Sequence, residues 1–327
     1  MTANHFSNKL LGGKFRVQDH LVLYSGSPIG VLNPATLLGA NRNNQNYIYG
    51  ILGRANVTGN DTEDIWAALI ASGSVLFGST EEAIEVASHL KDDRMSRTTS
   101  YICCLSKDCS QVINIINKIR AASVVVVGCG GIGSLAALLL SGAGIKHLKL
   151  IDPDTIEASN LNRQLIWKRS DIGRPKVEVL KREITERFLD IKIDTLQKQS
   201  TKDSLAVDIK GSDAILLSAD SPLGISSIFQ KAAKAEKIPL IATGYLLREA
   251  GITLSITDTP NNGDIEWTRS PFSIMPSFGP TNAELAGISC SLIIHAIAGI
   301  LPLDQKHLSA YWDLANFPRK VSEDKPS

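Results

Sequence analysis

The chain has 327 residues, enough for about two domains of roughly 100–200 residues each. Its 34 basic and 33 acidic residues leave a formal charge of +1, which excludes a nucleic-acid-binding protein whose affinity comes from a large positive excess. Hydrophobic residues make up 43% of the chain and charged residues 20%, so a large core is available and global disorder is excluded.

The cysteines and the apolar segments indicate in which cellular compartment the protein is expected. The chain has 5 cysteines, an odd number with no CxxC pair, which disfavours a disulfide framework and a four-cysteine zinc site. No basic segment followed by an apolar core stands at the N-terminus. The longest uncharged apolar run, 285–301, is shorter than the ~18–20 residues of a bilayer span. We therefore expect a cytoplasmic protein with no membrane segment, in which this run is a buried helix.

Residues 1–92 are predicted to form a small α+β module. Short strands are expected at 21–24 and 74–77, and helices at 62–72 and 80–90, each opened by a capping threonine with acidic residues in its first turn. The charged stretch 91–97 reads as a solvated connector. The chain is thereby divided into an N-terminal module, 1–92, and a larger domain, 93–327.

From residue 122 onward, strands alternate with helices. Strands are predicted at 123–127, 147–151, 191–196, 214–218, 240–243 and 251–258. Pro175 suits the first turn of one intervening helix, and 281–300 is predicted to be a long buried helix. This alternation predicts an α/β fold with a mostly parallel sheet covered by helices on both faces.

A glycine-rich loop is the first chemical signal. Gly128, Gly130, Gly131 and Gly133 follow one predicted strand and open a helix, and Asp152 ends the next strand. Such glycines let the backbone approach a phosphate, and the acidic residue can accept hydrogen bonds from ribose hydroxyls. Taken alone, the motif predicts a dinucleotide-binding fold and an NAD-dependent dehydrogenase. The alternative is a tight strand-to-helix turn without a ligand.

The segment after Asp152 favours a triphosphate over a nicotinamide. It carries Asp154, Asn160, Arg163 and Gln164, and Lys176 follows at the start of the next helix. Fixed Arg and Lys donors stabilise the negative charge that develops in nucleotidyl transfer, and a dehydrogenase has no use for such a cluster. The alternative is that Arg163 and Lys176 are surface charges.

Asp220 follows the predicted strand 214–218 directly. The carboxyl ends of parallel strands border the ligand crevice of such a sheet. A carboxylate there suits Mg²⁺, which takes oxygen ligands and bridges nucleotide phosphates. Asp220 could also cap the following helix.

Four separated motifs together resemble one family. They are GCGGIG at 128–133, LIDPDTIEASNLNRQ at 150–164, DIGRPKVEVLKREI at 171–184 and ILLSAD at 215–220. In this order they resemble the E1-like (ThiF/MoeB-type) adenylating family, which activates ubiquitin-type proteins, thiamine and molybdopterin sulphur carriers, and peptides. The resemblance covers roughly residues 94–300. DRMSR at 93–97 is most similar to the branch that adenylates microcin-type peptides, whose members carry an N-terminal peptide clamp.

The resemblance implies a Rossmann-like E1 adenylation fold that uses ATP and Mg²⁺, preceded by a winged-helix-like peptide clamp. It assigns the glycine loop to the ATP phosphates, Asp152 to the ribose and Asp220 to Mg²⁺. It places these residues around the nucleotide: Asp154, Asn160, Arg163, Gln164 and Lys176. Arg97 resembles an arginine that the neighbouring subunit contributes, which implies a homodimer with shared active sites.

The chain also departs from the family pattern. Most members carry two CxxC pairs for a structural zinc in the C-terminal half, where this chain has only Cys290, so no zinc is expected. A zinc-free member with a clamp resembles the branch that matures pantocin-type peptides. There, a glutamate side chain is activated and cyclised with a second glutamate. Tyr245, Arg248 and Glu249 are candidate substrate-facing residues.

The expected activity is adenylation of a carboxylate, such as a Glu side chain, on a ribosomally made precursor peptide, followed by dehydrative crosslinking in antibiotic biosynthesis. The alternatives are nucleotide transfer to a peptide C-terminus, activation of a ubiquitin-like sulphur carrier, and a non-catalytic member that only binds a partner. The dehydrogenase is a more distant alternative.

Overall fold

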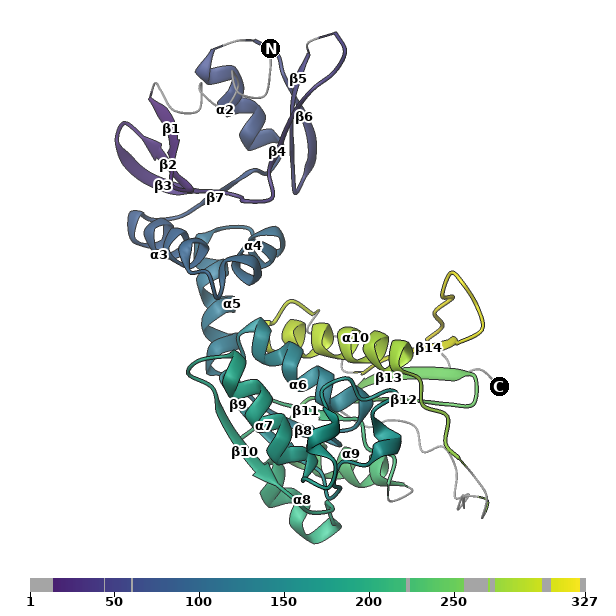
Figure 1. Cartoon of the computed structure of the whole chain (residues 1–327). Helices are drawn as coiled ribbons and strands as arrows, with labels where there is room; N and C mark the ends of the chain where they lie inside the picture. The colour runs from purple at the N-terminus through teal and green to yellow at the C-terminus, as the bar shows by residue number, and fades with distance from the viewer. Residues whose placement is uncertain are drawn as a thin grey trace. The chain divides into compact units, whose positions relative to one another are not determined.

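The structure is a computed structural model that describes residues 14–43, 45–59, 61–221, 224–255, 270, 274–301 and 307–323. The chain divides into two compact units, Met1–Asn117 (unit 1) and Lys118–Ser327 (unit 2). Figure 1 labels their helices and strands.

Unit 1 holds two small antiparallel sheets. One has the order β1 (Phe15–Gln18), β2 (Leu21–Tyr24), β3 (Ser27–Leu32) and β7 (Val75–Phe77), and the other β4 (Leu37–Ala40), β5 (Asn46–Gly50) and β6 (Gly53–Val57). Helix α2 (Thr62–Ala71) contributes Ile65 and Leu69 to a core shared with Val22 of β2 and Ile48 of β5. A single apolar core therefore joins both sheets through α2.

The strands and helices predicted in this region are confirmed, but their caps are not the predicted threonines. Asp61 caps α2, and Ser79 caps α3 (Thr80–Lys91), each through its side chain. The error is one residue in both cases. Each threonine is the first helical residue, so its own backbone is already helical, whereas a cap residue keeps an extended backbone.

The helices of unit 1 extend beyond the expected module boundary. α3 packs against β3 and against α4 (Ser96–Leu105), and α5 (Cys109–Ala121) follows. The expected connector is a short turn between α3 and α4 in which Met95 is 7% exposed. This compact unit therefore continues past residue 92, and the assignment of residues 1–92 to peptide recognition stays a prediction.

Unit 2 is built on a seven-stranded sheet. In spatial order its strands are β10 (Lys192–Leu196), β9 (His147–Ile151), β8 (Ser123–Val127), β11 (Ala214–Leu217), β12 (Leu240–Leu246), β13 (Glu249–Ser255) and β14 (His307–Asp313). The first five run parallel, and β13 and β14 continue the sheet antiparallel. The mostly parallel sheet is thus confirmed. Residues 256–258 of one predicted strand lie outside the described residues, and β14 was not predicted.

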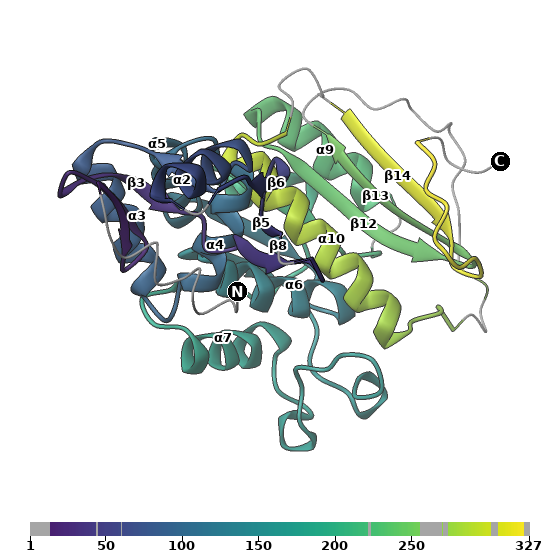
Figure 2. The ribbon, with the colours of Figure 1, turned by 90° about the horizontal axis from the view of Figure 1, so that it is seen from above.

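Helices cover both faces of this sheet (Figures 1 and 2). α6 (Gly131–Ala143) packs against α7 (Lys176–Arg187) and α10 (Gly279–Ala298) on one face. α8 (Lys202–Ile209) and α9 (Ile225–Glu236) pack together on the other, where Phe229 meets Ile215 and Leu240 in the core. The α/β fold expected from the alternation is confirmed.

α10 is the long helix predicted at 281–300. By length and composition it could cross a membrane, but it packs on α6 and on β12. Leu285 and Ile293 are fully buried in that contact. α10 is therefore a core helix of unit 2, as predicted.

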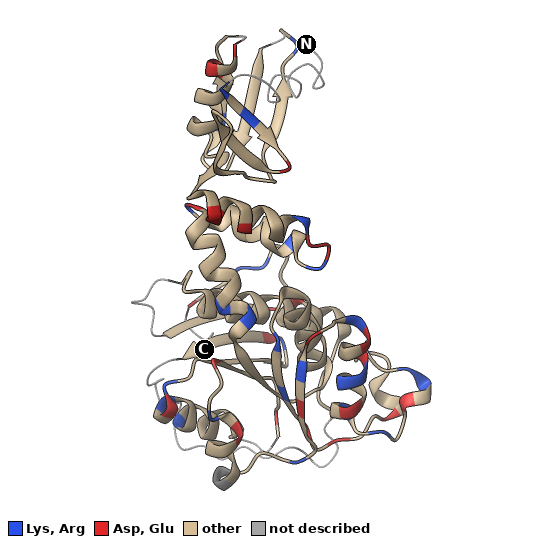
Figure 3. Ribbon diagram, turned by 90° about the vertical axis from the view of Figure 1, so that its left-hand side faces the viewer, with Lys and Arg blue, Asp and Glu red and all other residues tan. Residues whose placement is uncertain are grey.

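Charges of both signs are interspersed along the ribbon of the described chain (Figure 3). One group of ion pairs joins Arg182 to Asp171 and Glu183, each at 2.9 Å, with Lys168 3.1 Å from Glu183. Asp171 and Glu183 are 1% and 4% exposed. Some of the charges that balance in the total are thus also paired locally.

Candidate active site

A cavity of about 570 Å³ opens at the carboxyl ends of β8, β9 and β11 in unit 2. β8 lies where the strand order reverses, with β9 on one side and β11 on the other, and such a switch point forms a ligand crevice. The cavity collects most of the predicted site residues. They are Gly128, Gly130, Gly131, Asp152, Asp154, Asn160, Arg163, Gln164, Lys176 and Asp220.

Two glycines of the loop are required by close packing. Gly128 has φ +87°, and a Cβ on it would come within 2.8 Å of the Ala219 backbone nitrogen. A Cβ on Gly133 would overlap the Gly128 carbonyl oxygen and lie 2.7 Å from Ser218 Oγ. Gly133 is absent from the cavity lining. It allows α6 to begin close against the end of β8.

The N-terminus of α6 lies at the cavity. Gly130 is the N-cap residue, and no side chain caps the helix. The first-turn N–H groups and the positive end of the helix dipole are therefore available to an anion. This arrangement suits a phosphate group.

Asp152 holds the glycine loop in place. It is 4% exposed, and its two carboxylate oxygens accept the backbone N–H groups of Cys129 at 2.6 Å and Asp154 at 2.8 Å. Burial raises the pKa of Asp152, and the nearby Lys176 ammonium and the two amides oppose that rise. The carboxylate thus supports the loop, and its predicted contact with a ribose stays a prediction.

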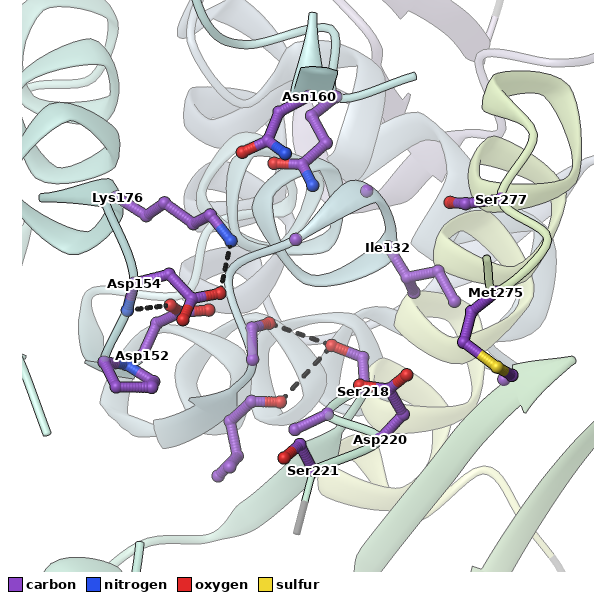
Figure 4. A pocket seen from close by; sticks show the side chains of 18 of the residues that line it. Ile132, Asp152, Asp154, Asn160, Lys176, Ser218, Asp220, Ser221, Met275 and Ser277 are labelled. Atoms are coloured by element: carbon purple, nitrogen blue, oxygen red, sulfur yellow. Dashed lines mark hydrogen bonds and ion pairs between the residues drawn. The ribbon is translucent and has the colours of Figure 1, made fainter. Parts of the chain in front are cut away.

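Lys176 brings a positive charge to the cavity wall. Its side chain is 7% exposed, and Nζ lies 2.7 Å from Asp154 Oδ2, whose side chain is 60% exposed. Figure 4 shows this pair at one side of the pocket, beside Asp152. Pro175 is the N-cap residue of α7 and not a first-turn residue, so the prediction was one position off. Lys176 is therefore the first helical residue, at the cavity edge.

The loop between β9 and α7 supplies three polar side chains. Asn160 and Gln164 are buried, and Gln164 Oε1 accepts the Trp167 indole N–H at 2.7 Å. Arg163 is half-buried, and its Nη1 donates to the Ser159 carbonyl at 2.6 Å. The turn thereby fixes the Arg163 side chain within its own loop, and Arg163 is one of the residues that line the cavity.

Asp220 lies at the cavity on the segment that follows β11. Figure 4 shows it beside Ser218 and Ser221, across the pocket from Lys176. Ser218 Oγ donates to the Gly128 carbonyl at 2.9 Å, which ties this segment to the glycine loop. Gly224 is the N-cap residue of α9, so the alternative role of Asp220 as that cap is wrong.

Of the remaining predicted site residues, only one is among the described residues that line the cavity. Tyr245 lines the cavity, but neither Arg248 nor Glu249 is among its described lining residues. Arg248 instead pairs with Asp313 at 2.6 Å, because β13 and β14 bring the two together. Arg97 lies on α4 in unit 1, whereas all the lining residues described belong to unit 2.

Sequence reasoning missed two parts of the wall. Lys198, Gln199 and Ser200 follow β10, and 275–277 with Asn282 precede and begin α10. The first part was accessible in principle, because β10 is another parallel strand that ends at the same edge. The second comes from a helix far along the chain, and no local sequence signal pointed to it.

The cysteines do not form a reactive group in the described chain. Burial raises the pKa of Cys103 and Cys290 to about 12 and that of Cys109 to about 11. Burial also raises the pKa of Cys129, which is fully buried in the glycine loop. Because the thiolate is the nucleophile and the metal ligand, these thiols are inert.

A family model places the chain. The model described as the ThiF family matches residues 112–324, which is more than half of the sequence. The chain belongs to the ThiF family. The E1-like resemblance of the four motifs is thereby confirmed.

Curated relatives align with part of the chain. The sulfur carrier protein ThiS adenylyltransferase of Escherichia coli is 36% identical over 104 residues, which is 32% of this chain and 41% of that protein. The molybdopterin-synthase adenylyltransferase of Haemophilus influenzae is 32% identical over 144 residues, 44% of this chain and 58% of that protein. The chain spans about two-fifths to three-fifths of the length of these relatives, both of which are adenylyltransferases.

Solved structures extend the likeness of the fold to nearly the whole chain. Escherichia coli MccB with MccA-N7isoASN superposes with a TM-score of 0.71 at 19% identity, covering 91% of this chain and 97% of that one. PaaA gives a TM-score of 0.64 at 19% identity, over 88% of this chain and 98% of that one. The predicted E1-like adenylation fold is confirmed.

Proposed function

We propose that this chain is an ATP-dependent enzyme that adenylates a carboxylate, such as a glutamate side chain, on a ribosomally made precursor peptide. The observation that carries the proposal is the convergence of Arg163, Lys176 and Asp220 on one cavity beside the N-terminus of α6. Two cations and a helix N-terminus are complementary to a triphosphate. A nicotinamide carries no charge that would use them.

In the proposed reaction, a carboxylate oxygen of the peptide attacks the α-phosphorus of ATP. The bond from that phosphorus to the bridging oxygen breaks, and pyrophosphate leaves with the electron pair. The peptide is then an acyl-adenylate, which is a reactive electrophile. In the crosslinking step, the nucleophile is an amide nitrogen, which loses its proton to a base on attack, or a carbanion, whose proton has already been removed. It attacks the acyl carbon, the bond from that carbon to the phosphate oxygen breaks, and AMP leaves with the electron pair, so that the peptide loses one water overall.

The residues of the chain have separate tasks in this reaction. The open amides of α6 bind phosphate oxygens, and the Lys176 ammonium and Arg163 guanidinium stabilise the charge that develops on the α-phosphate and the leaving pyrophosphate. The Asp154 carboxylate holds the ammonium at 2.7 Å. Because the lysine is buried against this partner, little reorganisation is needed when the charge develops.

The position of Asp220 suits a ligand of Mg²⁺. Its carboxylate is exposed at the cavity across from Lys176 (Figure 4). Mg²⁺ in nucleotide sites is held by one or two carboxylates together with phosphate oxygens. When bound, the ion would neutralise phosphate charge.

The peptide substrate is supported by unit 1, whose described residues add two sheets, helices α2 to α4 and most of α5 to the nucleotide fold of unit 2. Structural neighbours include MccB with the peptide MccA and with ATP, and PaaA. We propose that unit 1, and residues 1–92 in particular, recognises the precursor peptide. After adenylation, the peptide is crosslinked within itself as a step of antibiotic biosynthesis. We place this reaction in the cytoplasm and propose that the enzyme has no structural zinc. Nucleotide transfer to a peptide C-terminus is the alternative on the same architecture.

Activation of a ubiquitin-like sulphur carrier is the second candidate. It is supported by the similarity to the ThiS adenylyltransferase and the molybdopterin-synthase adenylyltransferase. Both candidates share the adenylation step and differ in the carboxylate that enters the cavity.

Pyrophosphate–ATP exchange tests the proposal. We expect exchange to depend on an acidic peptide, and Lys176→Ala and Arg163→Ala each to lower its kcat/KM by about 10²–10³, as losses of transition-state donors do. Asp220→Asn should raise the Mg²⁺ concentration that is needed. Arg187→Ala is the matched control, because Arg187 lies at the other end of α7, outside the described lining of the cavity.

The outcomes distinguish the candidates. Exchange with a sulphur-carrier protein but with no acidic peptide would select the second candidate, and NADH binding without any exchange would reject adenylation. With a peptide that supports exchange, mass spectrometry separates the fates. Loss of water, with or without carbon dioxide, indicates crosslinking, and added nucleotide mass indicates transfer.

We further propose a homodimer in which Arg97 acts on the partner's site. Neither Arg97→Ala nor Asp220→Ala subunits should be active alone. In an equal mixture, about a quarter of the wild-type activity should return, because half of the dimers are mixed and each mixed dimer has one intact site. If mixing restores no activity although the subunits exchange, Arg97 does not act in trans.

A further inference from the structure

Asn282 occupies a central position in the cavity wall. It lies in the first turn of α10, is 3% exposed and lines the cavity. Its side-chain amide oxygen accepts the Tyr245 hydroxyl at 3.0 Å. Its amide nitrogen lies 3.4 Å from the Arg163 carbonyl and 3.5 Å from Ser277 Oγ. One amide therefore contacts β12, the loop that carries Arg163 and the segment before α10.

The Tyr245 hydroxyl links the backbone of Phe278 to the side chain of Asn282. The Tyr245 oxygen accepts the Phe278 backbone N–H at 2.5 Å, while its hydroxyl proton is donated to Asn282. Phe278 ends the segment 274–278, which contributes Met275 and Ser277 to the wall. Figure 4 shows these two side chains on the opposite side of the pocket from Lys176 and Asp154. A displacement of this segment would therefore shift the Tyr245 hydroxyl and change its hydrogen bond to Asn282.

The Arg163 side is held less tightly. The distance of 3.4 Å from Asn282 Nδ2 to the Arg163 carbonyl is at the long end for a hydrogen bond. The same Nδ2 fills the space that a Cβ on Gly131 would occupy. Asn282 thus packs against the start of α6 and against the residue that presents the guanidinium.

Local helix chemistry does not account for these contacts. An asparagine in a helix usually bonds to nearby backbone, and the N-terminus of α10 has no side-chain cap. Tyr245 and Arg163 are 37 and 119 residues away from Asn282. The contacts are therefore tertiary.

We propose that Asn282 is a positioning residue that couples the wall segment 274–278, through Tyr245, to Arg163 in the nucleotide site. This inference rests on the proposed adenylation, in which Arg163 binds the triphosphate. The consequence is that the substrate-facing wall and the nucleotide site respond to one another.

Double-mutant cycles on ATP binding test the coupling, with a fluorescent ATP analogue and Mg²⁺ as the probe. We expect Asn282→Leu and Arg163→Ala each to weaken binding by about tenfold, as the loss of one hydrogen bond to a charged group does. The double variant should bind no more weakly than Arg163→Ala alone, because coupled residues are not additive. Tyr245→Phe should weaken binding in the wild-type background and not in the Asn282→Leu background.

The controls separate positioning from folding. Ser289 lies two turns further along α10, is fully buried and is absent from the described cavity lining. Ser289→Ala should therefore leave ATP binding unchanged. If Asn282→Leu lowers the melting temperature below the assay range, Asn282→Asp serves instead, since it keeps the acceptor for Tyr245 and loses the donor to Arg163. Its cycle with Arg163→Ala should again be non-additive.

The outcomes are distinct from those of the proposed function. Losses that multiply in the double variants, or an Asn282→Leu protein that binds ATP within about twofold of wild type, would overturn the coupling. ATP binding needs no peptide, so a coupled cycle in a protein without pyrophosphate exchange would reject the proposed function and retain this inference. An absence of ATP binding in the wild type would reject both.

Discussion

Replacement of Gly133 by alanine tests why the glycine loop has its sequence. Within a helix, alanine is favoured over glycine by about 0.8–1.0 kcal/mol, so propensity alone predicts that Gly133→Ala in α6 is stabilising. The new Cβ would, however, overlap the Gly128 carbonyl oxygen and lie 2.7 Å from Ser218 Oγ. The carbonyl is backbone at the end of β8 and cannot rotate away. α6 must therefore move relative to the sheet.

The sign of the effect follows from the two magnitudes. Overpacking of this kind costs about 1–3 kcal/mol, and an overlap with backbone belongs to the upper part of that range. After the gain in helix propensity, a net loss of about 1–2 kcal/mol in the free energy of unfolding remains. For a unit of the size of unit 2, this lowers the melting temperature by roughly 2–8 °C. ATP affinity should fall as well, because Gly128 and Gly131 border the cavity.

Thermal unfolding and binding of a fluorescent ATP analogue measure both effects. Gly287→Ala is the matched control: it makes the same substitution in α10, where a Cβ would meet nothing within 4 Å, and it should stabilise by about 0.5–1 kcal/mol. If the two substitutions shift the melting temperature in the same direction and by the same amount, the packing argument for Gly133 is refuted.

Two further predictions concern titration and thiol reactivity. Burial raises the pKa of Asp171, but hydrogen bonds from a backbone N–H and from Arg182 outweigh it and hold the pKa below its ordinary value of 3.8. Its stabilising contribution is therefore present above pH ~4 and lost as the pH falls through the lowered pKa. Urea unfolding between pH 3 and 7 should show a shallower decline for Asp171→Asn, and an unchanged decline would contradict this. Alkylation of the native protein at pH 8 should label half-buried Cys104 first, since the pKa of Cys103 and that of Cys290 are raised to about 12. Early labelling of Cys290 would count against its burial.

Local patterns in the sequence predicted much of the fold. The predicted strands 123–127 and 147–151 are β8 and β9 with the predicted bounds. Four consecutive valines, 124–127, signalled β8, because a strand buried on both faces is apolar along its length. The caps of α2 and α3 were predicted one residue late, since several adjacent residues could act as caps and only the backbone angles select one. β14 was missed because its pairing partner, β13, lies far back in the chain.

For the site, local sequence patterns were enough to predict the residues near the glycine loop, since the carboxyl ends of parallel strands border the ligand crevice. Asp152 and Asp220 were predicted from this rule, and Lys176 from the positive charge it brings to the start of the following helix; all three line the cavity. Tertiary structure alone decided which contacts these residues make. Gly133 packs α6 against β8 and does not line the cavity, and Arg248 pairs with Asp313. Asn282 of α10 contacts the Arg163 carbonyl. Such contacts depend on which distant helices and strands become neighbours, and no local pattern of residues encodes that.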